Sequence, residues 1–310
     1  RAPRMGERYG EGRDPVFVDD VATCLTATEI MSEMPPPRRL AVDIHAKNLA
    51  SMNLKISLIQ IGMENPYYRP GTNLSLDART LVFVFDIATL RRRAFAPDRE
   101  GGGGLGEILQ SDDIQKILFD GRSDSSGLLR EYGVELRNTL DLQQLYVLHT
   151  GNRALLGFAT ALEDFMAKEG FREEDKRRVR SARARGRELV RPGGKFMFGN
   201  WLSRPLPPDL LEYAVVDVRY LIPMADLLAR LIKAANPVQG QVEKGTPLRW
   251  LSNAKLKTAS FEGDGDAPDE VLVSRMATRY IDEVRNEWTM KRAAVVVGGV
   301  ESGTSAHTFV

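Results

Sequence analysis

Hydrophobic residues in the first 120 positions gather in short runs, and these runs predict β-strands. Residues 40–44 and 81–86 are apolar almost throughout, as expected for buried strands. Residues 55–62 alternate β-branched side chains with other residues, and residues 114–119 form a further apolar run. We therefore expect four strands before residue 120.

After residue 120 the apolar spacing changes to that of helices. Residues 123–132 begin with Ser and Asp and have helical spacing, and further helices are expected at 141–149 and 155–168. Pro207 and Pro208 open a strongly helical segment that we expect to continue to residue 233. Strands that come first and then alternate with helices predict an α/β domain.

The two ends of the chain lack this patterning. Residues 1–35 are irregular and end in a run of prolines, and the chain beyond residue 236 is rich in Gly and acidic residues. One helix is expected there, at about residues 269–294. The predicted organisation is an irregular N-terminal extension (1–35), a central domain (36–235) and a C-terminal extension (236–310).

Composition excludes several classes of protein. The chain of 310 residues is 43% hydrophobic and has a single cysteine, Cys24, so no intramolecular disulfide can form. One Cys and three His cannot supply the usual ligands of a zinc finger. No apolar run approaches the roughly 18 to 20 residues that span a bilayer. We therefore expect no membrane contact.

The cysteine content also bears on the compartment. A reducing, intracellular compartment fits a lone cysteine better than secretion does. Four arginines near the start favour an organellar, mitochondrial origin, although the acidic residues among them argue against an intact transit peptide. The nucleus and the cytoplasm remain open as alternatives.

Charge is segregated along the chain. Residues 176–191 contain eight basic residues and one acidic residue, a net +7, so the rest of a chain of net charge +1 carries −6. Such a basic arm, at about residues 172–191, is expected to be an exposed arm or a basic helix suited to phosphate contacts, and a solvated surface loop is the alternative. The candidate nucleic-acid-binding residues are Arg178, Arg180, Arg183, Arg185 and Arg187.

Three acidic residues and a tyrosine form a pattern across distant segments. Asp43 ends the first expected strand, and Asp124 begins the helix after the fourth. Asp217 lies in the last helix, four residues after Tyr213 and hence on the same helical face. Taken singly, these residues would be read as a strand-end hydrogen-bonding residue, a helix cap and a buried polar pair.

The surrounding sequence makes the combination specific. Residues 42–45 read Val-Asp-Ile-His and precede Asn48-Leu49 and the strand at 56–62, while Asp124 lies within a second motif at 117–136, followed by Asp-Leu-Gln at 141–143. The third motif is Trp-Leu-Ser-Arg-Pro-Leu at 201–206, followed by Tyr-x-x-x-Asp at 213–217. Chance matches to one motif are common, but matches to all three in this order are not.

These motifs resemble those of the RNase D-like 3′–5′ exonucleases, the tyrosine-containing branch of the DEDD superfamily. The resemblance covers about residues 40–231. It implies a ribonuclease H-like fold, a mixed sheet flanked by helices. It also implies catalytic roles for Asp43, Asp124, Asp217 and Tyr213, with the three carboxylates as metal ligands and the tyrosine hydroxyl orienting the attacking water.

Phosphodiester hydrolysis explains why such a family needs converging carboxylates. Two metal ions about 4 Å apart can activate water, neutralise the phosphate and support the leaving oxygen. The hard ions Mg²⁺ and Mn²⁺ prefer oxygen ligands, so carboxylates from separate segments must meet. We expect two such ions if the site is active.

One position departs from the family pattern. His45 lies two residues after Asp43 on a strand, on the same face, where the family has a Glu. Imidazole offers one nitrogen and no negative charge, and it is a poor ligand for Mg²⁺. His45 is therefore a replacement ligand for a softer ion, a packed histidine in an inactive site, or a sign that the motif has been aligned out of register.

Two functions follow from the sequence, and a third is less favoured. The first is a 3′–5′ exonuclease-type domain acting on single-stranded RNA, less so DNA, with activity impaired if His45 weakens metal binding. The second is a catalytically inactive RNA-binding or scaffolding subunit of a ribonucleoprotein, with protein partners on the basic arm and the C-terminal tail. The third is a protein-interaction module without nucleic-acid contact.

Overall fold

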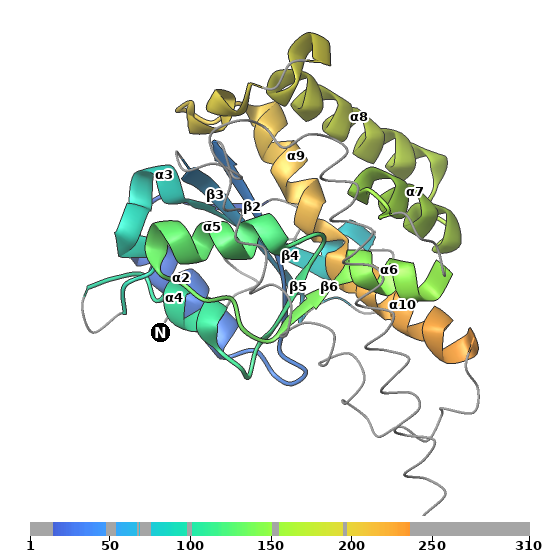
Figure 1. Cartoon of the computed structure of the whole chain (residues 1–310), viewed down its shortest axis with the longest axis horizontal. Helices are drawn as coiled ribbons and strands as arrows, with labels where there is room; N and C mark the ends of the chain where they lie inside the picture. The colour runs from blue at the N-terminus through green and yellow to red at the C-terminus, as the bar shows by residue number, and fades with distance from the viewer. Residues whose placement is uncertain are drawn as a thin grey trace, which may run out of the picture.

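A six-stranded sheet of mixed direction runs through the computed structural model (Figure 1). The structure describes residues 15–47, 54–66, 68, 76–97, 101–150, 155–194 and 197–235. The strands are β1 (Val16–Val18), β2 (Arg39–Lys47), β3 (Lys55–Glu64), β4 (Thr80–Asp86), β5 (Gln115–Leu118) and β6 (Thr139–Asp141). Their order is β1-β4-β3-β2-β5-β6, with β3 antiparallel to both β2 and β4 and the other pairs parallel. This confirms the predicted ribonuclease H-like mixed sheet.

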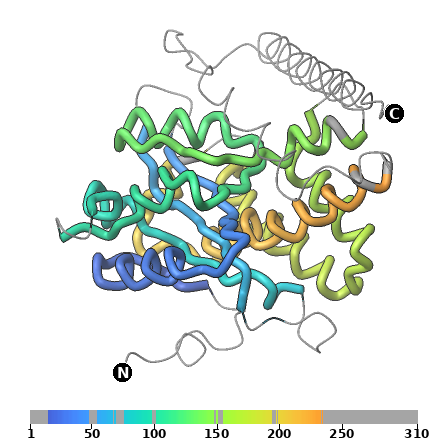
Figure 2. The backbone as a smooth tube through the Cα atoms, turned by 90° about the horizontal axis from the view of Figure 1, so that it is seen from below, coloured from blue at the N-terminus to red at the C-terminus, as the bar shows by residue number. Residues whose placement is uncertain are grey.

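Helices cover both faces of the sheet and produce three layers (Figure 2). One face is covered by α2 (Val21–Ser32), α3 (Ile87–Leu90), α4 (Leu105–Gln110) and α5 (Arg122–Tyr132). The other face is covered by α6 (Leu142–Thr150), α7 (Phe158–Lys168), α8 (Glu173–Val190), α9 (Pro208–Arg219) and α10 (Leu221–Ala235). Of the helices in the described ranges, none combines the length and hydrophobicity of a bilayer-spanning segment.

The alternation of side chains along β2 determines on which face of the sheet the candidate site lies. Leu40, Val42 and Ile44 pack into the core beneath α2, α4 and α5, whereas Ala41 packs into the core beneath α9 and α10. Successive side chains of a strand point to opposite faces. Asp43 and His45 therefore share the face of Ala41 and point toward α9.

The prediction that residues 1–35 are irregular is wrong for the part that the structure describes. β1 pairs with β4 in parallel, and α2 packs against the sheet through Cys24, Ala27 and Met31. Asp20 caps α2 by accepting a hydrogen bond from the Thr23 backbone N–H at 2.9 Å. The three-residue strand is too short for its periodicity to stand out, although the capping signal was present in the sequence.

The predicted helix at 207–233 is in fact two helices. α9 ends at Arg219 and α10 begins at Leu221, with Tyr220 between them. The physical reason is Pro223, which has no backbone N–H to donate to the carbonyl of Arg219 and is tolerated only in the first turn of a new helix. The structure also adds the short strand β6, which the sequence analysis did not identify. The helix expected at 269–294 and Asn48-Leu49 lie outside the described residues.

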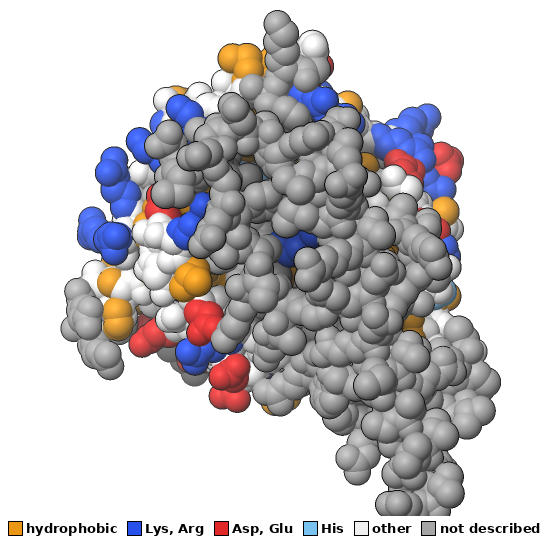
Figure 3. Space-filling model, viewed as in Figure 1, with side chains coloured by type: hydrophobic (Ala, Val, Ile, Leu, Met, Phe, Trp, Pro, Cys, Tyr) orange, Lys and Arg blue, Asp and Glu red, His pale blue; other side chains and the backbone are white. Residues whose placement is uncertain are grey.

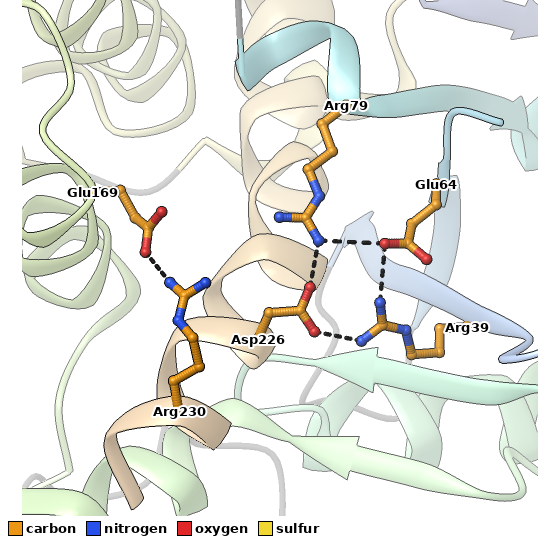
Figure 4. A network of polar contacts seen from close by, with 6 residues as sticks. All are labelled: Arg39, Glu64, Arg79, Glu169, Asp226 and Arg230. Carbon is orange, nitrogen blue, oxygen red and sulfur yellow. Dashed lines mark hydrogen bonds and ion pairs between the residues drawn. The ribbon is translucent and has the colours of Figure 1, made fainter. Parts of the chain in front are cut away.

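Four charged residues tie α10 to the sheet in a closed ion-pair network (Figure 4). Asp226 of α10 binds Arg39, at the start of β2, at 2.6 Å and also binds Arg79. Glu64, at the end of β3, binds Arg39 at 2.9 Å and Arg79 at 3.3 Å. Two carboxylates thus balance two guanidinium groups, and all four side chains are at least partly buried. A separate pair joins Arg230 of α10 to Glu169.

Candidate active site

Strand β2 carries two of the predicted site residues on one face. His45 Nε2 lies 3.5 Å from Asp43 Oδ2. Asp43 pairs with Gln60 of β3, whose side-chain amide donates to the Asp43 carbonyl oxygen at 2.7 Å and lies 3.3 Å from Oδ2. The register of β2 against β3 shifts between His45 and Ala46, an irregularity of the kind that often lies beside active sites.

Helix α9 brings the third motif onto the same spot. Asp217 Oδ2 lies 3.5 Å from His45 Nε2, so the imidazole nitrogen lies between two carboxylates. Tyr213, one turn earlier on α9, has its ring centroid 5.8 Å from that of His45. The first and third motifs, 170 residues apart in sequence, thus meet across the interface of α9 with the sheet.

Asp124 lies near the same site but on α5, which covers the other face of the sheet from α9. Its carboxyl group is buried, with 6% of the residue exposed, and its pKa is raised well above the usual value by burial and by the charges of Asp43, Asp120 and Asp141. Within the described residues, however, the group of ligand atoms that all lie within 4.8 Å of one another consists of Asp43, His45 and Asp217. Asp124 lies near enough to Asp43 to interact with it electrostatically, without belonging to that closest group.

Asp141, the last residue of β6, has a structural role. Its carboxylate accepts hydrogen bonds from the backbone N–H groups of Asp120, Gly121 and Gln143. These bonds hold the turn that leads into α5 and fix the helix start that carries Asp124. Asp141 is thus a turn-stabilising residue rather than one of the closest ligand group.

Burial disfavours the charged forms of the ionisable side chains in the site. It raises the pKa of Asp43 to about 6 and that of Asp217 to about 6, with the Arg183 charge opposing both shifts. Burial lowers the pKa of His45 to about 4, so its imidazole is neutral at pH 7. The charge of Asp217, and then burial, raises the pKa of Tyr213, so its hydroxyl keeps its proton.

Trp201 forms the floor under His45. The indole stacks on the imidazole with ring centroids 3.9 Å apart and planes 19° apart, and it is 3% exposed. Arg204 holds this loop by a bidentate pair with Asp86, at 2.7 and 2.5 Å, while Ser57 donates to the Trp201 carbonyl oxygen. The Trp-x-x-Arg motif therefore sets the position of the His45 ring.

Arg183 of α8 enters the site, a placement that the sequence analysis did not foresee. Its Nη1 donates to Asp217 Oδ1, and its guanidinium carbon lies 4.8 Å from the centroid of the Phe158 ring and 5.1 Å from that of Tyr213. The signal was the buried spacing Val179, Ala182, Gly186, which places Arg183 at the edge of the buried stripe of α8.

Most of the other basic-arm candidates that the sequence analysis singled out pair with acidic residues of neighbouring elements. Arg178 binds Asp77, Arg180 binds Glu163 and Arg185 binds Asp209 and Glu212, while Arg187 is exposed. Figure 3 shows acidic and basic side chains next to one another over the region that α8 occupies in Figure 1. The arm is a packed helix whose charge is partly neutralised.

Most of the chain matches one protein-family model. The model of the family described as 3′-5′ exonuclease matches residues 16–233, which is more than half of the chain. The chain belongs to the 3′–5′ exonuclease family. This confirms the resemblance found in the sequence, and members of this family typically use divalent metal ions.

Curated relatives share only part of their length with this exonuclease-family chain. It is 28% identical to the mouse (Mus musculus) piRNA biogenesis protein EXD1 over 162 residues, 49% of this chain and 25% of the mouse protein. It is 29% identical to the human (Homo sapiens) protein of the same name over 147 residues, 46% of this chain and 26% of the human protein. The match thus covers about a quarter of each relative.

Solved structures share the fold of the exonuclease domain. The Trypanosoma brucei RNase D:GMP complex has a TM-score of 0.56 and 22% sequence identity, and the match covers 87% of this chain and 73% of the other. The T. brucei RNase D complex with RNA U12 has a TM-score of 0.53 and 22% identity, with 88% and 82% covered. At this identity the likeness establishes the fold.

The donor set of this exonuclease site fits a divalent cation. Two carboxylates and a neutral imidazole converge within 4.8 Å, and the buried His45 Nε2 has no hydrogen-bond partner in the described part of the chain. An uncompensated buried nitrogen between two acids is a favourable position for a metal ion. Because one donor is nitrogen, the set suits Mn²⁺ or Zn²⁺ better than Mg²⁺.

Proposed function

We propose that this chain is a 3′–5′ exonuclease-type domain that acts on single-stranded RNA, less so on DNA. The observation that carries the proposal is the convergence of Asp43, His45, Asp217 and Tyr213 at the contact of β2 with α9. The printed names of the relatives support RNA as the partner, since one is a piRNA biogenesis protein and another structure is a complex with RNA U12.

In this proposal the chain's own residues prepare the reaction. Asp43, Asp217 and His45 would hold a divalent ion, with Asp124 adding negative charge for a second, and such ions lower the pKa of water and neutralise the phosphate when bound. Tyr213 keeps its proton at Oη, so it can orient the attacking water by a hydrogen bond. Trp201 fixes the His45 ring beneath the reacting centre.

The test is hydrolysis of 5′-labelled single-stranded RNA by purified protein with Mg²⁺ or with Mn²⁺. We expect stepwise shortening from the 3′ end, faster with Mn²⁺, and at least about a hundredfold loss in Asp217→Asn, since misplacement alone costs that much. Glu169→Gln, which removes a carboxylate paired with Arg230 on the α7–α10 side, is the control and should keep full activity. Equal rates for Asp217→Asn and wild type would contradict the proposed site.

A second function is favoured by two specific observations. His45 stands in place of a family Glu, and Arg183 already neutralises Asp217. Both suit a catalytically inactive RNA-binding or scaffolding subunit of a ribonucleoprotein. RNA binding without cleavage, together with activity appearing in His45→Glu, would establish this second function and overturn the first.

A further inference from the structure

Arg183 differs from the other arginines of α8 in the carboxylate it binds. Three of them pair with acids outside the site: Arg178, Arg180 and Arg185. Arg183 pairs instead with Asp217, one of the three residues whose ligand atoms lie within 4.8 Å of one another. The Arg183 side chain is 18% exposed and that of Asp217 is 10% exposed, so the pair is largely shielded from water. A shielded pair is stronger than a surface pair.

Arg183 binds one of the two oxygens of a carboxylate that a metal ion would also bind. Asp217 has two carboxylate oxygens: Oδ1 accepts from Arg183, and Oδ2 faces His45 Nε2 at 3.5 Å. A divalent cation at Asp217 would lie close to a guanidinium of the same sign of charge, and like charges in a shielded site repel strongly. Metal and Arg183 therefore compete for Asp217.

Close packing of α8 on α9 restricts any movement of Arg183 to its side chain. A Cβ at Gly186 would lie 2.3 Å from the Cβ of Tyr213, far inside ordinary carbon contact, so α8 and α9 meet backbone to side chain at this point. Arg183, one turn earlier, keeps a fixed Cα. Its guanidinium lies 4.8 Å from the centroid of the Phe158 ring and 5.1 Å from that of Tyr213, so it has cation–π contacts in addition to its bond to Asp217.

A phosphate is the natural ligand for the released guanidinium. Arginine binds phosphate oxygens by paired N–H donors, and this bond has the same chemistry as its bond to Asp217. We propose that Arg183 is a phosphate-binding residue of the site. It holds Asp217 while no phosphate is bound, transfers to the substrate phosphate on binding, and thereby frees Asp217 for the metal ion. This inference rests on the proposed function.

The experiment measures Mn²⁺ binding to the full chain by electron paramagnetic resonance, which reads free Mn²⁺ and needs no activity. We expect Arg183→Gln to lower the dissociation constant for Mn²⁺ at least tenfold relative to wild type. Arg230→Gln also removes a guanidinium paired with a carboxylate, but outside the site, and should leave the Mn²⁺ affinity unchanged. Arg183→Lys, which keeps the charge, should stay within about threefold of wild type. Circular dichroism of each variant reports folding.

A second measurement adds adenosine 5′-monophosphate, a nucleoside monophosphate that cannot be cleaved further. It should tighten Mn²⁺ binding to wild type more than to Arg183→Gln, because only wild type has a guanidinium to withdraw from Asp217. By linkage, Mn²⁺ should tighten nucleotide binding by the same factor. Any tightening caused by a direct bond between the nucleotide and the metal ion would be the same in wild type and Arg183→Gln, so the difference between them reports on Arg183.

The outcomes separate the two proposals. Equal Mn²⁺ affinity of folded wild type and Arg183→Gln would overturn the role of Arg183 and leave the exonuclease proposal standing. Absence of Mn²⁺ binding in wild type, Arg183→Gln and His45→Glu alike would overturn both. A tenfold gain in Arg183→Gln without any gain in Arg230→Gln would establish the competition.

Discussion

Two clusters of charge join α9 and α10 to the sheet, and they are built in opposite ways. In the network of Figure 4, Asp226 and Glu64 are matched by Arg39 and Arg79. In the candidate site, the carboxylates of Asp43, Asp124 and Asp217 lie near a single guanidinium and a neutral imidazole. The balanced cluster stabilises the fold, whereas the unbalanced one retains negative charge for a ligand.

The balanced cluster should respond most strongly to loss of an acid. Asp226→Asn leaves two partly buried guanidinium groups with only Glu64, and we expect the free energy of unfolding to fall by about 2–3 kcal/mol. Urea denaturation of Asp226→Asn and wild type at pH 7.5 measures this fall. The exposed pair offers the control, because Arg230→Gln should cost no more than about 0.5 kcal/mol. Similar losses in both variants would show that the network contributes no more than a surface pair.

Loss of an acid from the candidate site should raise the free energy of unfolding, the opposite of its effect in the network of Figure 4. Burial raises the pKa of Asp43 from 3.8 to about 6, so folding favours the protonated carboxyl and the ionised form opposes it. Asp43→Asn should therefore stabilise the metal-free protein at pH 7.5 by about 1–3 kcal/mol. We expect this gain in urea denaturation with a chelator present. A loss of stability there would mean that the site carboxylates act as structural anchors.

The same comparison predicts a pH dependence. The cost of an acid with a raised pKa is absent below about pH 4, grows as the pH rises toward 6, and is then constant. The difference between Asp43→Asn and wild type should therefore shrink to near zero at pH 4. Urea unfolding curves of Asp43→Asn and wild type at pH 4, 5, 6 and 7.5 measure this change. A gain in Asp43→Asn that is the same at every pH would contradict the burial of Asp43.

Placements that depend on local periodicity could be predicted from the sequence, whereas those that depend on contacts between distant helices could not. Local periodicity placed Asp43 and His45 on one face of a strand and Tyr213 and Asp217 on one face of a helix, and these placements are correct. The motif resemblance then joined the two faces. The position of the Arg183 side chain depends instead on how α8 packs on α9; the spacing of Val179, Ala182 and Gly186 indicates a buried stripe but not which carboxylate Arg183 meets. A high density of arginines indicated solvent exposure, which holds for Arg180 and Arg185 although each binds a neighbouring acid, whereas Arg183 is 18% exposed.

Two errors along the chain have simpler causes. β1 has three residues, which is too few for alternation to distinguish a strand from a loop. The division at Tyr220 was visible as Pro223, but the unbroken apolar stripe on both sides outweighed it. Tertiary contacts complete both features, since β1 gains its hydrogen bonds from β4 and Tyr220 donates one to Asp77.

The stacking of Trp201 on His45 has an optical consequence. Indole emission is sensitive to a charge placed against its face, and this indole lies 3.9 Å from the imidazole. An ion that takes the lone pair of His45 Nε2 puts positive charge beside the fluorophore. With Trp250 and Trp288 replaced by Phe, the intensity of the one remaining tryptophan follows the occupancy of the site in real time, and the protein needs no attached dye.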